Sequence, residues 1–142
     1  MNSATHSPVH TTTYDRSACS VGILHLGFGA FHRAHQAVYI DDYMQVSGDL
    51  RWGIAAVNLR GSETAHFDIA DADITRNDGY YLKSYSADGD VALRLVRSHI
   101  HFADWSADKA KTEALLSEPS VHLVTITVTE SGYYTDPNGN LN

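Results

Sequence analysis

Two glycines separated by one residue, between an apolar run and a helical pattern, constrain the fold of this chain most. The apolar run covers residues 21–26, and Gly27 and Gly29 follow it. From Phe31 to Tyr39, apolar side chains then recur at three- and four-residue steps, which is the period of a helix. A strand, a tight glycine turn and a helix form the opening of a mononucleotide-binding βαβ unit. The sequence therefore predicts an α/β fold that begins with this unit.

The residues of the turn suit a bound phosphate. Gly27 lets the chain turn sharply off the strand, and Gly29 lacks a Cβ, so that a pyrophosphate can approach the backbone. The helix that follows directs unpaired N–H groups and its positive end toward the same place. His32 stands where the usual pattern has a third glycine or alanine. The spacing alone therefore admits either a phosphate site or a plain strand–helix turn, and Arg33 could neutralise a phosphate or simply cap the helix.

The residues around the glycines give a more specific indication. The segment GFGAFHRAHQ, residues 27–36, resembles the start of the long-chain polyol dehydrogenases, the family of mannitol dehydrogenase and fructuronate reductase, which opens with G-x-G-x-F-H-R-A-H-Q. Three later segments resemble the family in the same order: WGIAAVNLR at 52–60, NDGYYL at 77–82 and VTITVTESGYY at 124–134. The resemblance covers residues 21 to 136, and its first motif is the specific one.

This resemblance implies an NAD(P)-dependent oxidoreductase that acts on a polyol or sugar acid such as mannitol, arabinitol or mannonate. In that family, hydride passes between the nicotinamide and a secondary-alcohol carbon. The general base is a lysine of a second, helical domain, in a K-x-x-x-x-N-x-x-H motif. None of the three lysines here, Lys83, Lys109 and Lys111, has an asparagine five residues further on. We therefore expect residues 21–142 to be a truncated, partial Rossmann-type NAD-binding domain, with the substrate domain absent, no catalytic residue present and no activity alone.

A second interpretation is a free-standing, non-catalytic module that binds a dinucleotide or pairs with another chain. The turn-rich end at residues 136–142 favours the interpretation as a fragment. The coding sequence after Asn142 would separate the two, because an open continuation indicates a fragment and a stop codon leaves the module possible.

The end of the second predicted strand, residues 52–59, bears on the choice of cofactor. An acidic residue there usually binds the 2′-hydroxyl of the adenosine ribose. Here the end carries Asn58 and Arg60, and Glu63 stands just beyond. Arg60 could accept a 2′-phosphate, which favours NADP, whereas Glu63 favours NAD. We expect NAD, with NADP the less favoured cofactor.

A third group of candidates follows the strand predicted at residues 121–129, which is rich in β-branched residues and expected to be buried. Ligands of open parallel sheets bind beyond the carboxyl ends of the strands. The predicted cofactor-binding residues are therefore Gly27, Phe28, Gly29, Ala30, Phe31, His32, Arg33, Asn58, Arg60, Glu63, Thr129 and Glu130.

The remaining elements follow from periodicity and turn residues. We expect a loosely ordered segment at 1–20, helices at 30–46, 62–73 and 104–117, and an antiparallel pair inserted into the parallel sheet, at 80–85 and 91–102. Residues 47–49 stop the first helix, Ser62 and Ser106 offer N-caps to the other two, and residues 86–90 form the hairpin turn.

Nine histidines raise the possibility of a metal site. They include three close pairs, each without a third ligand: His6 and His10, His32 and His35, and His99 and His101. We expect the first pair to be solvated, the second to pack around the glycine turn, and the third to lie on a surface face of a strand. His25 interrupts the first strand and is interpreted as a hydrogen-bonded core residue. The sequence therefore predicts no metal site.

Composition excludes several partners. The net charge of −7 leaves no basic surplus for nucleic acid, and no apolar run approaches the length of a membrane span. The single cysteine, Cys19, fits a reducing compartment, and the N-terminus shows no signal-peptide pattern. With 142 residues, one domain is expected. We expect a cytoplasmic protein that acts on a small molecule.

Overall fold

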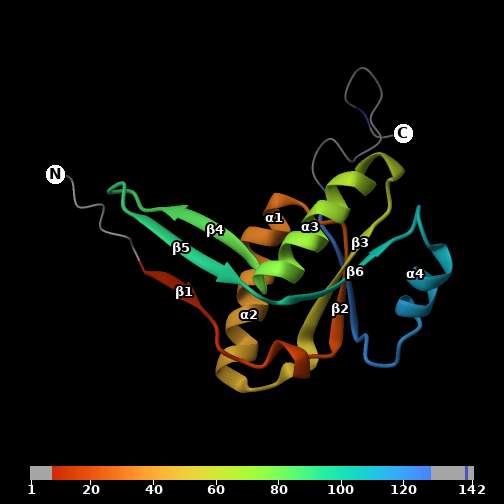
Figure 1. The fold of residues 1–142 in the computed structure, drawn as a ribbon, viewed down its shortest axis with the longest axis horizontal. Coiled ribbons are helices and arrows are strands. Elements are labelled where there is room, and N and C mark those ends of the chain that lie inside the picture. Colours follow the sequence, from red (N-terminus) through yellow and green to blue (C-terminus); the bar gives the residue numbers. More distant parts are fainter. Residues whose placement is uncertain (1–7, 129–139, 141–142) are drawn as a thin grey trace.

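A four-stranded parallel sheet forms the centre of the fold. The structure, a computed structural model, describes residues 8–128 and residue 140. The sheet has the order β6-β3-β2-β7 and contains β2 (Val21–Leu26), β3 (Gly53–Asn58), β6 (His99–Asp104) and β7 (Leu123–Ile126), all paired in parallel (Figure 1). The chain therefore starts in the middle of the sheet, adds two strands on one side and then crosses to the other, as in doubly wound nucleotide-binding folds.

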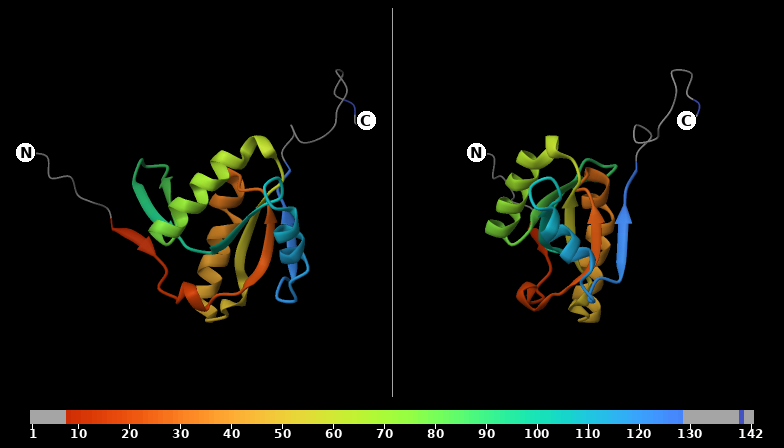
Figure 2. Two further views of the ribbon diagram at one scale, coloured as in Figure 1. Left: turned by 45° about the vertical axis from the view of Figure 1, so that its right-hand side comes forward. Right: turned by 90° about the vertical axis from the view of Figure 1, so that its right-hand side faces the viewer.

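Helices cover both faces of this sheet (Figure 2). On one face lie α1 (Ala30–Ala34), α2 (Gln36–Ser47) and α3 (Thr64–Asn77), and on the other lies α4 (Lys109–Leu116). Side chains of β2 alternate between the two layers, because Ile23 packs with Ala37 of α2 whereas Leu24 packs in a cluster with Leu115 of α4. This near-continuous burial explains the apolar runs in β2 and β3.

The predicted antiparallel pair is confirmed, but it forms a sheet of its own. Strands β4 (Tyr80–Tyr85) and β5 (Val91–Val96) pair antiparallel, and β1 (Val9–Thr11) adds to β5 in parallel. The single strand predicted at residues 91–102 is wrong, because β5 ends at Val96 and β6 begins at His99 in the other sheet. Between them the Ser98 hydroxyl donates to the Ala37 carbonyl at 2.8 Å, which holds the crossing point against α2.

The helices differ from the sequence prediction at their ends. The first one breaks at His35, whose φ of −124° and ψ of −83° separate α1 from α2, and it ends as predicted before Gly48, which has a φ of +69°. A short 3-10 turn, η3 (Gly61–Glu63), precedes α3, so Ser62 is not its N-cap. Asp108, rather than Ser106, caps α4 by accepting a hydrogen bond from the Lys111 N–H.

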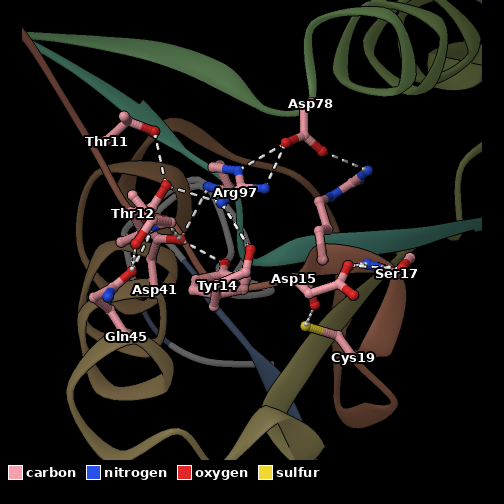
Figure 3. Close-up of polar contacts among 12 residues, drawn as sticks. Thr11, Thr12, Tyr14, Asp15, Ser17, Cys19, Asp41, Gln45, Asp78 and Arg97 are labelled. Carbon is pink, nitrogen blue, oxygen red and sulfur yellow. Dashed lines mark hydrogen bonds and ion pairs between the residues drawn. The ribbon is translucent and has the colours of Figure 1, made fainter.

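The N-terminal segment differs from the expectation of loose order over residues 8–20, while residues 1–7 lie outside the described part. After β1 it forms a 3-10 turn, η1 (Arg16–Ala18). The buried carboxylate of Asp41 accepts hydrogen bonds from the hydroxyls of Thr12 (3.1 Å) and Tyr14 (2.6 Å), as Figure 3 shows. The Arg97 guanidinium donates to the carbonyls of the same two residues. The segment is therefore fastened to α2 and to the residue that follows β5.

Strand β7 is the edge of the parallel sheet, and the expectation that it is buried is wrong. Leu123, Val124 and Ile126 are 45%, 50% and 59% exposed, respectively. Its one pairing partner is β2 among the described strands. The β-branched composition thus predicted a strand correctly but not its position in the sheet, because composition alone does not distinguish a central strand from an edge strand.

Candidate cofactor site

A cavity of about 410 Å³ lies at the carboxyl ends of β2, β3 and β7. It therefore occupies the place where the strand order reverses, which is where ligands of open α/β sheets bind. The cavity is lined by Leu26, Gly27, Phe28, Gly29, Asn58, Leu59, Arg60, Glu63, His66, Phe67, Ile126 and Thr127.

The glycine turn forms one wall of the cavity. Gly27 has a φ of +105°, a conformation that L-residues rarely adopt, and its N–H donates to the Val57 carbonyl at 2.7 Å. Gly29 has an ordinary φ of −72°. A Cβ built at Gly29 would meet no atom of the described residues within 4 Å. Gly27 is thus required by the backbone, whereas Gly29 leaves open space beside the chain, which fits a group that approaches the backbone closely.

Phe28, between the two glycines, anchors the turn. Its ring meets four others edge to face, with centroid distances of 5.0 Å to His99, 5.3 Å to Phe102, 5.9 Å to Tyr80 and 6.2 Å to Phe67. The guanidinium carbon of Arg33 lies 5.0 Å from the ring centroid. The Tyr80 hydroxyl donates to the Arg33 carbonyl at 2.6 Å. Such aromatic contacts add stability beyond the area they bury, so they hold the turn against the sheet.

At the end of β3, Asn58 shapes the second wall. Its side-chain amide donates to the Arg60 carbonyl at 3.0 Å and to Asp104 Oδ2 at 2.8 Å, and its Oδ1 accepts from the Arg60 N–H at 3.0 Å. Burial raises the pKa of Asp104, but hydrogen bonds from Asn58, Thr64 and two backbone N–H groups outweigh this and lower it. The side-chain amide of Asn58 is therefore hydrogen-bonded to other groups of the protein. The charged residues that line the cavity are Arg60 and Glu63, which are both exposed.

His32 does not line the cavity and is 1% exposed. Its Nδ1 lies 2.9 Å from Gln36 Oε1, and its Nε2 lies 2.9 Å from His99 Nε2. The His25 ring stacks on it with a centroid distance of 3.5 Å, and His25 Nδ1 lies 2.8 Å from the Thr125 hydroxyl. Burial lowers the pKa of both His25 and His32 to about 4, and the neighbouring His25 lowers that of His32 further. Both rings are neutral at pH 7, as the interpretation of His25 as a hydrogen-bonded core residue requires.

The third histidine pair is separated, and its predicted surface position is wrong for His99. His99 is fully buried and contacts His32, whereas His101 is half-buried. Burial lowers the pKa of His101, Lys111 lowers it further and Asp71 opposes the shift. In a regular strand, residues two apart point to the same face. The register between β3 and β6 shifts after Ile54, between the partners of His99 and His101, so this rule does not hold for the pair. Within residues 8–128 and 140, no three His, Cys, Asp or Glu side chains are grouped to hold a metal ion.

The cavity brings together six of the twelve predicted residues: Gly27, Phe28, Gly29, Asn58, Arg60 and Glu63. Ala30, Phe31, His32 and Arg33 do not line it, and Thr129 and Glu130 lie outside the described residues. Sequence reasoning missed Leu26, Leu59, His66, Phe67, Ile126 and Thr127. Leu26 and Ile126 end their strands, so their position at the carboxyl edge was the available signal, whereas His66 and Phe67 of α3 offered none.

No helix in the described part of the chain is long and apolar enough to cross a membrane.

An open parallel sheet with a glycine turn at its switch point defines a Rossmann-type dinucleotide-binding domain. Comparison with known proteins makes this specific. The family profile of the mannitol dehydrogenase Rossmann domain matches residues 21–140, and the chain belongs to this family.

Curated relatives and solved structures agree with this assignment. Mannitol 2-dehydrogenases of Pyricularia oryzae and Emericella nidulans are 34% and 39% identical over 94% and 92% of this chain, respectively. The chain spans only about a quarter of their length, 26% and 25%. The structure of a Pseudomonas fluorescens mannitol 2-dehydrogenase in ternary complex with NAD and D-mannitol superimposes with a TM-score of 0.75 at 30% identity. A substrate-free D-sorbitol dehydrogenase gives a TM-score of 0.78 at 27% identity. Each of these two matches covers 94% of this chain and 27% of the chain of the solved structure.

Proposed function

We propose that this chain is the NAD-binding portion of a cytoplasmic oxidoreductase that transfers hydride between NAD and a secondary alcohol of a polyol or sugar acid, such as mannitol, arabinitol or mannonate. One observation carries the proposal: the Gly27–Gly29 turn borders open space at the switch point of the sheet. The relatives named mannitol 2-dehydrogenase support the substrate class, and the neighbour in complex with NAD and D-mannitol supports the cofactor.

The lining residues suit a dinucleotide in two ways. The backbone at Gly27 and Gly29 lets a pyrophosphate approach, because no side chain intervenes. Glu63, exposed in η3, can accept hydrogen bonds from ribose hydroxyls and would repel a 2′-phosphate. We therefore favour NAD over NADP, with Arg60 as the residue that would favour NADP. When bound, the cofactor supplies the nicotinamide carbon that accepts or donates the hydride.

Titration with NADH tests the site. Gly29→Val places a branched side chain in the open space, and the φ of −72° lets valine fold there without strain. We expect NADH affinity to fall on the order of a hundredfold, with an unchanged Tm, because the pyrophosphate loses its approach. Ala92→Val, in the exposed part of β5 away from the cavity, is the matched control and should bind as the wild type does. Equal affinity of the Gly29 variant and the wild type would contradict the phosphate site.

Turnover tests the rest of the proposal. Hydride transfer needs a substrate held beside the nicotinamide and a base that takes the hydroxyl proton. The K-x-x-x-x-N-x-x-H segment that supplies this base in the family is absent from the sequence. We therefore expect no NADH formation from mannitol, arabinitol or mannonate, even at high protein concentration, by a preparation that mass spectrometry shows to end at Asn142. Sustained turnover would show that residues 1–142 contain the base. Binding without turnover fits both a separated cofactor domain and the non-catalytic module.

A further inference from the structure

A set of polar side chains, three of them buried histidines and two partly buried, joins elements from across the domain. We call it the histidine cluster; its members are His25 of β2, His32 of α1, Gln36 of α2, His99 of β6 and Thr125 of β7. Gln36 Oε1 is shared, because it lies 2.9 Å from His32 Nδ1 and accepts from the Thr125 hydroxyl at 3.2 Å. The cluster therefore connects three strands of the parallel sheet to both halves of the first helix.

The hydrogen bonds assign the protons of His32 and His99. With Gln36 oriented so that its Oε1, which only accepts, faces His32, the proton of His32 is on Nδ1 and its Nε2 carries a lone pair. His99 must then donate from Nε2, which leaves its buried Nδ1 as an acceptor without a partner among the described residues. The opposite arrangement would bury an unpaired N–H at His99 Nδ1, which is rarer in proteins than an under-used acceptor. Neutral rings throughout agree with the lowered pKa of all three histidines.

His99 also touches the turn itself. Its ring is the nearest of the four that meet Phe28 edge to face, with 5.0 Å between centroids. Its carbonyl accepts from Arg16 Nε at 3.2 Å and from Arg16 Nη2 at 2.5 Å, so the N-terminal segment holds its backbone. His99 is thus held by its backbone carbonyl, and its ring contacts both Phe28 of the glycine turn and His32 of α1.

We propose that His99 is a positioning residue for the cofactor: its Nε2–H holds His32 at the start of α1, and its ring supports Phe28 between the two glycines. The inference rests on the proposed NAD site and adds to it the residue that sets the shape of the turn. His99 does not line the cavity and touches no ligand position itself. It acts because its ring makes the shortest of the ring contacts that hold Phe28, and a shift of about 1 Å in a binding wall is costly.

The proton positions give a first test that needs no ligand. Long-range ¹H–¹⁵N correlation spectra of the full chain at pH 7 distinguish the two neutral imidazole forms. We expect His32 as the Nδ1–H form and His99 as the Nε2–H form, each assigned by its loss in His32→Gln or His99→Gln. A His32 ring protonated at Nε2 would overturn the proposal, since His99 could then not donate to it.

Affinity for NADH gives the second test. His99→Leu removes the donor, and we expect its Kd for NADH to rise on the order of tenfold. His99→Gln can place an N–H near the same point, and its Kd should stay within about threefold of the wild type. Val96→Ala, a fully buried change in β5 at a residue that does not line the cavity, is the stability control. It should lower the Tm as His99→Leu does without raising the Kd.

The outcomes separate this inference from the proposed function. If the wild type binds NADH and His99→Leu binds equally well, positioning by His99 is wrong and the NAD site stands. If Val96→Ala weakens binding as much as His99→Leu does, the effect is one of general stability and the inference is again wrong. If the wild type does not bind NADH, the proposed function fails and the inference fails with it. Should His99→Leu not fold, the proton positions in the wild type decide.

Discussion

The cavity and the histidine cluster hold their polar side chains in opposite environments. On the cavity side, Arg60 and Glu63 are exposed, and their side chains make no hydrogen bond or ion pair with another described residue. On the buried side, His25 and His32 are 2% and 1% exposed, and each has a hydrogen-bonding partner. The segment from Gly27 to Gln36 belongs to both sides, since its glycines border the cavity whereas His32 is buried in the core and the partly buried Gln36 hydrogen-bonds to it.

This difference follows from the cost of desolvation. A charged group at the surface keeps its hydration and stays available to a ligand at little cost. A polar group in the core must be satisfied inside the protein, and once satisfied it fixes the elements that it joins. The segment with the specific family motif therefore combines an open glycine turn beside the cavity with a histidine, His32, that is fixed in the core. The two sides should respond differently to acid, to changes in backbone conformation and to changes in charge.

Acid should produce the largest effect, and on the buried side. The folded pKa of His25 and His32 is about 4, against an ordinary value of 6.5, so the unfolded chain binds more protons below pH 6.5. The contribution of these two histidines to the free energy of unfolding should therefore be fully present above that pH and should be lost as the pH drops toward 4. Each residue should contribute a loss of roughly 2 kcal/mol between pH 7 and pH 5.

Urea unfolding at the two pH values measures this loss. His25→Phe keeps a ring that can stack on His32 but removes one titrating group, so its loss on acidification should be smaller than that of the wild type. His10→Phe, at an exposed position in β1, is the control and should lose as much as the wild type. An undiminished loss in His25→Phe would mean that His25 is not held neutral by the core.

Backbone conformation gives the next effect, and it separates the two glycines of the turn. Gly27→Ala forces a Cβ into a φ of +105° and should lower the free energy of unfolding by about 1–2 kcal/mol. Gly29→Ala, at a φ of −72°, should change it by less than about 0.5 kcal/mol. Chemical denaturation of the two single variants makes the comparison. Equal losses would indicate that the turn adopts another conformation in solution.

Much of this division could be predicted from the sequence, because it depends on local patterns. The glycine turn between strand and helix, the hairpin insertion and the stop at Gly48 each leave a mark within a few neighbouring residues. The polar end of β3 was found in the same way, through Asn58, Arg60 and Glu63. Positions that depend on one strand and the turn after it were therefore accessible without a structure.

The parts that were missed depend on distant contacts. The alternation of residues 91–102 continues through the point where the chain leaves one sheet for the other, so the burial of His99 against His32, 67 residues away, left no local sign. The segment 8–20 is polar and looks unstructured, but Asp41, 29 residues after Thr12, holds it. The exposure of β7 depends on which strands stand beside it, and periodicity does not report that.

Charge on the cavity side should give the smallest effect on stability but a clear one on cofactor choice. Glu63 and Arg60 both line the cavity, and they favour opposite cofactors, because a 2′-phosphate is repelled by the carboxylate and attracted by the guanidinium. Glu63→Gln removes the repulsion while keeping the shape of the side chain. We expect it to improve NADPH binding relative to NADH by about three- to tenfold, corresponding to roughly 1 kcal/mol near an exposed site. The ratio of the two dissociation constants, measured at one ionic strength, reports this change, and the free energy of unfolding should stay within about 0.5 kcal/mol of the wild type.

Arg60→Gln is the matched variant and should move the ratio the other way, toward NADH. If the wild type already prefers NADPH and only Arg60→Gln changes the ratio, Arg60 governs the pocket and the proposed preference for NAD is wrong.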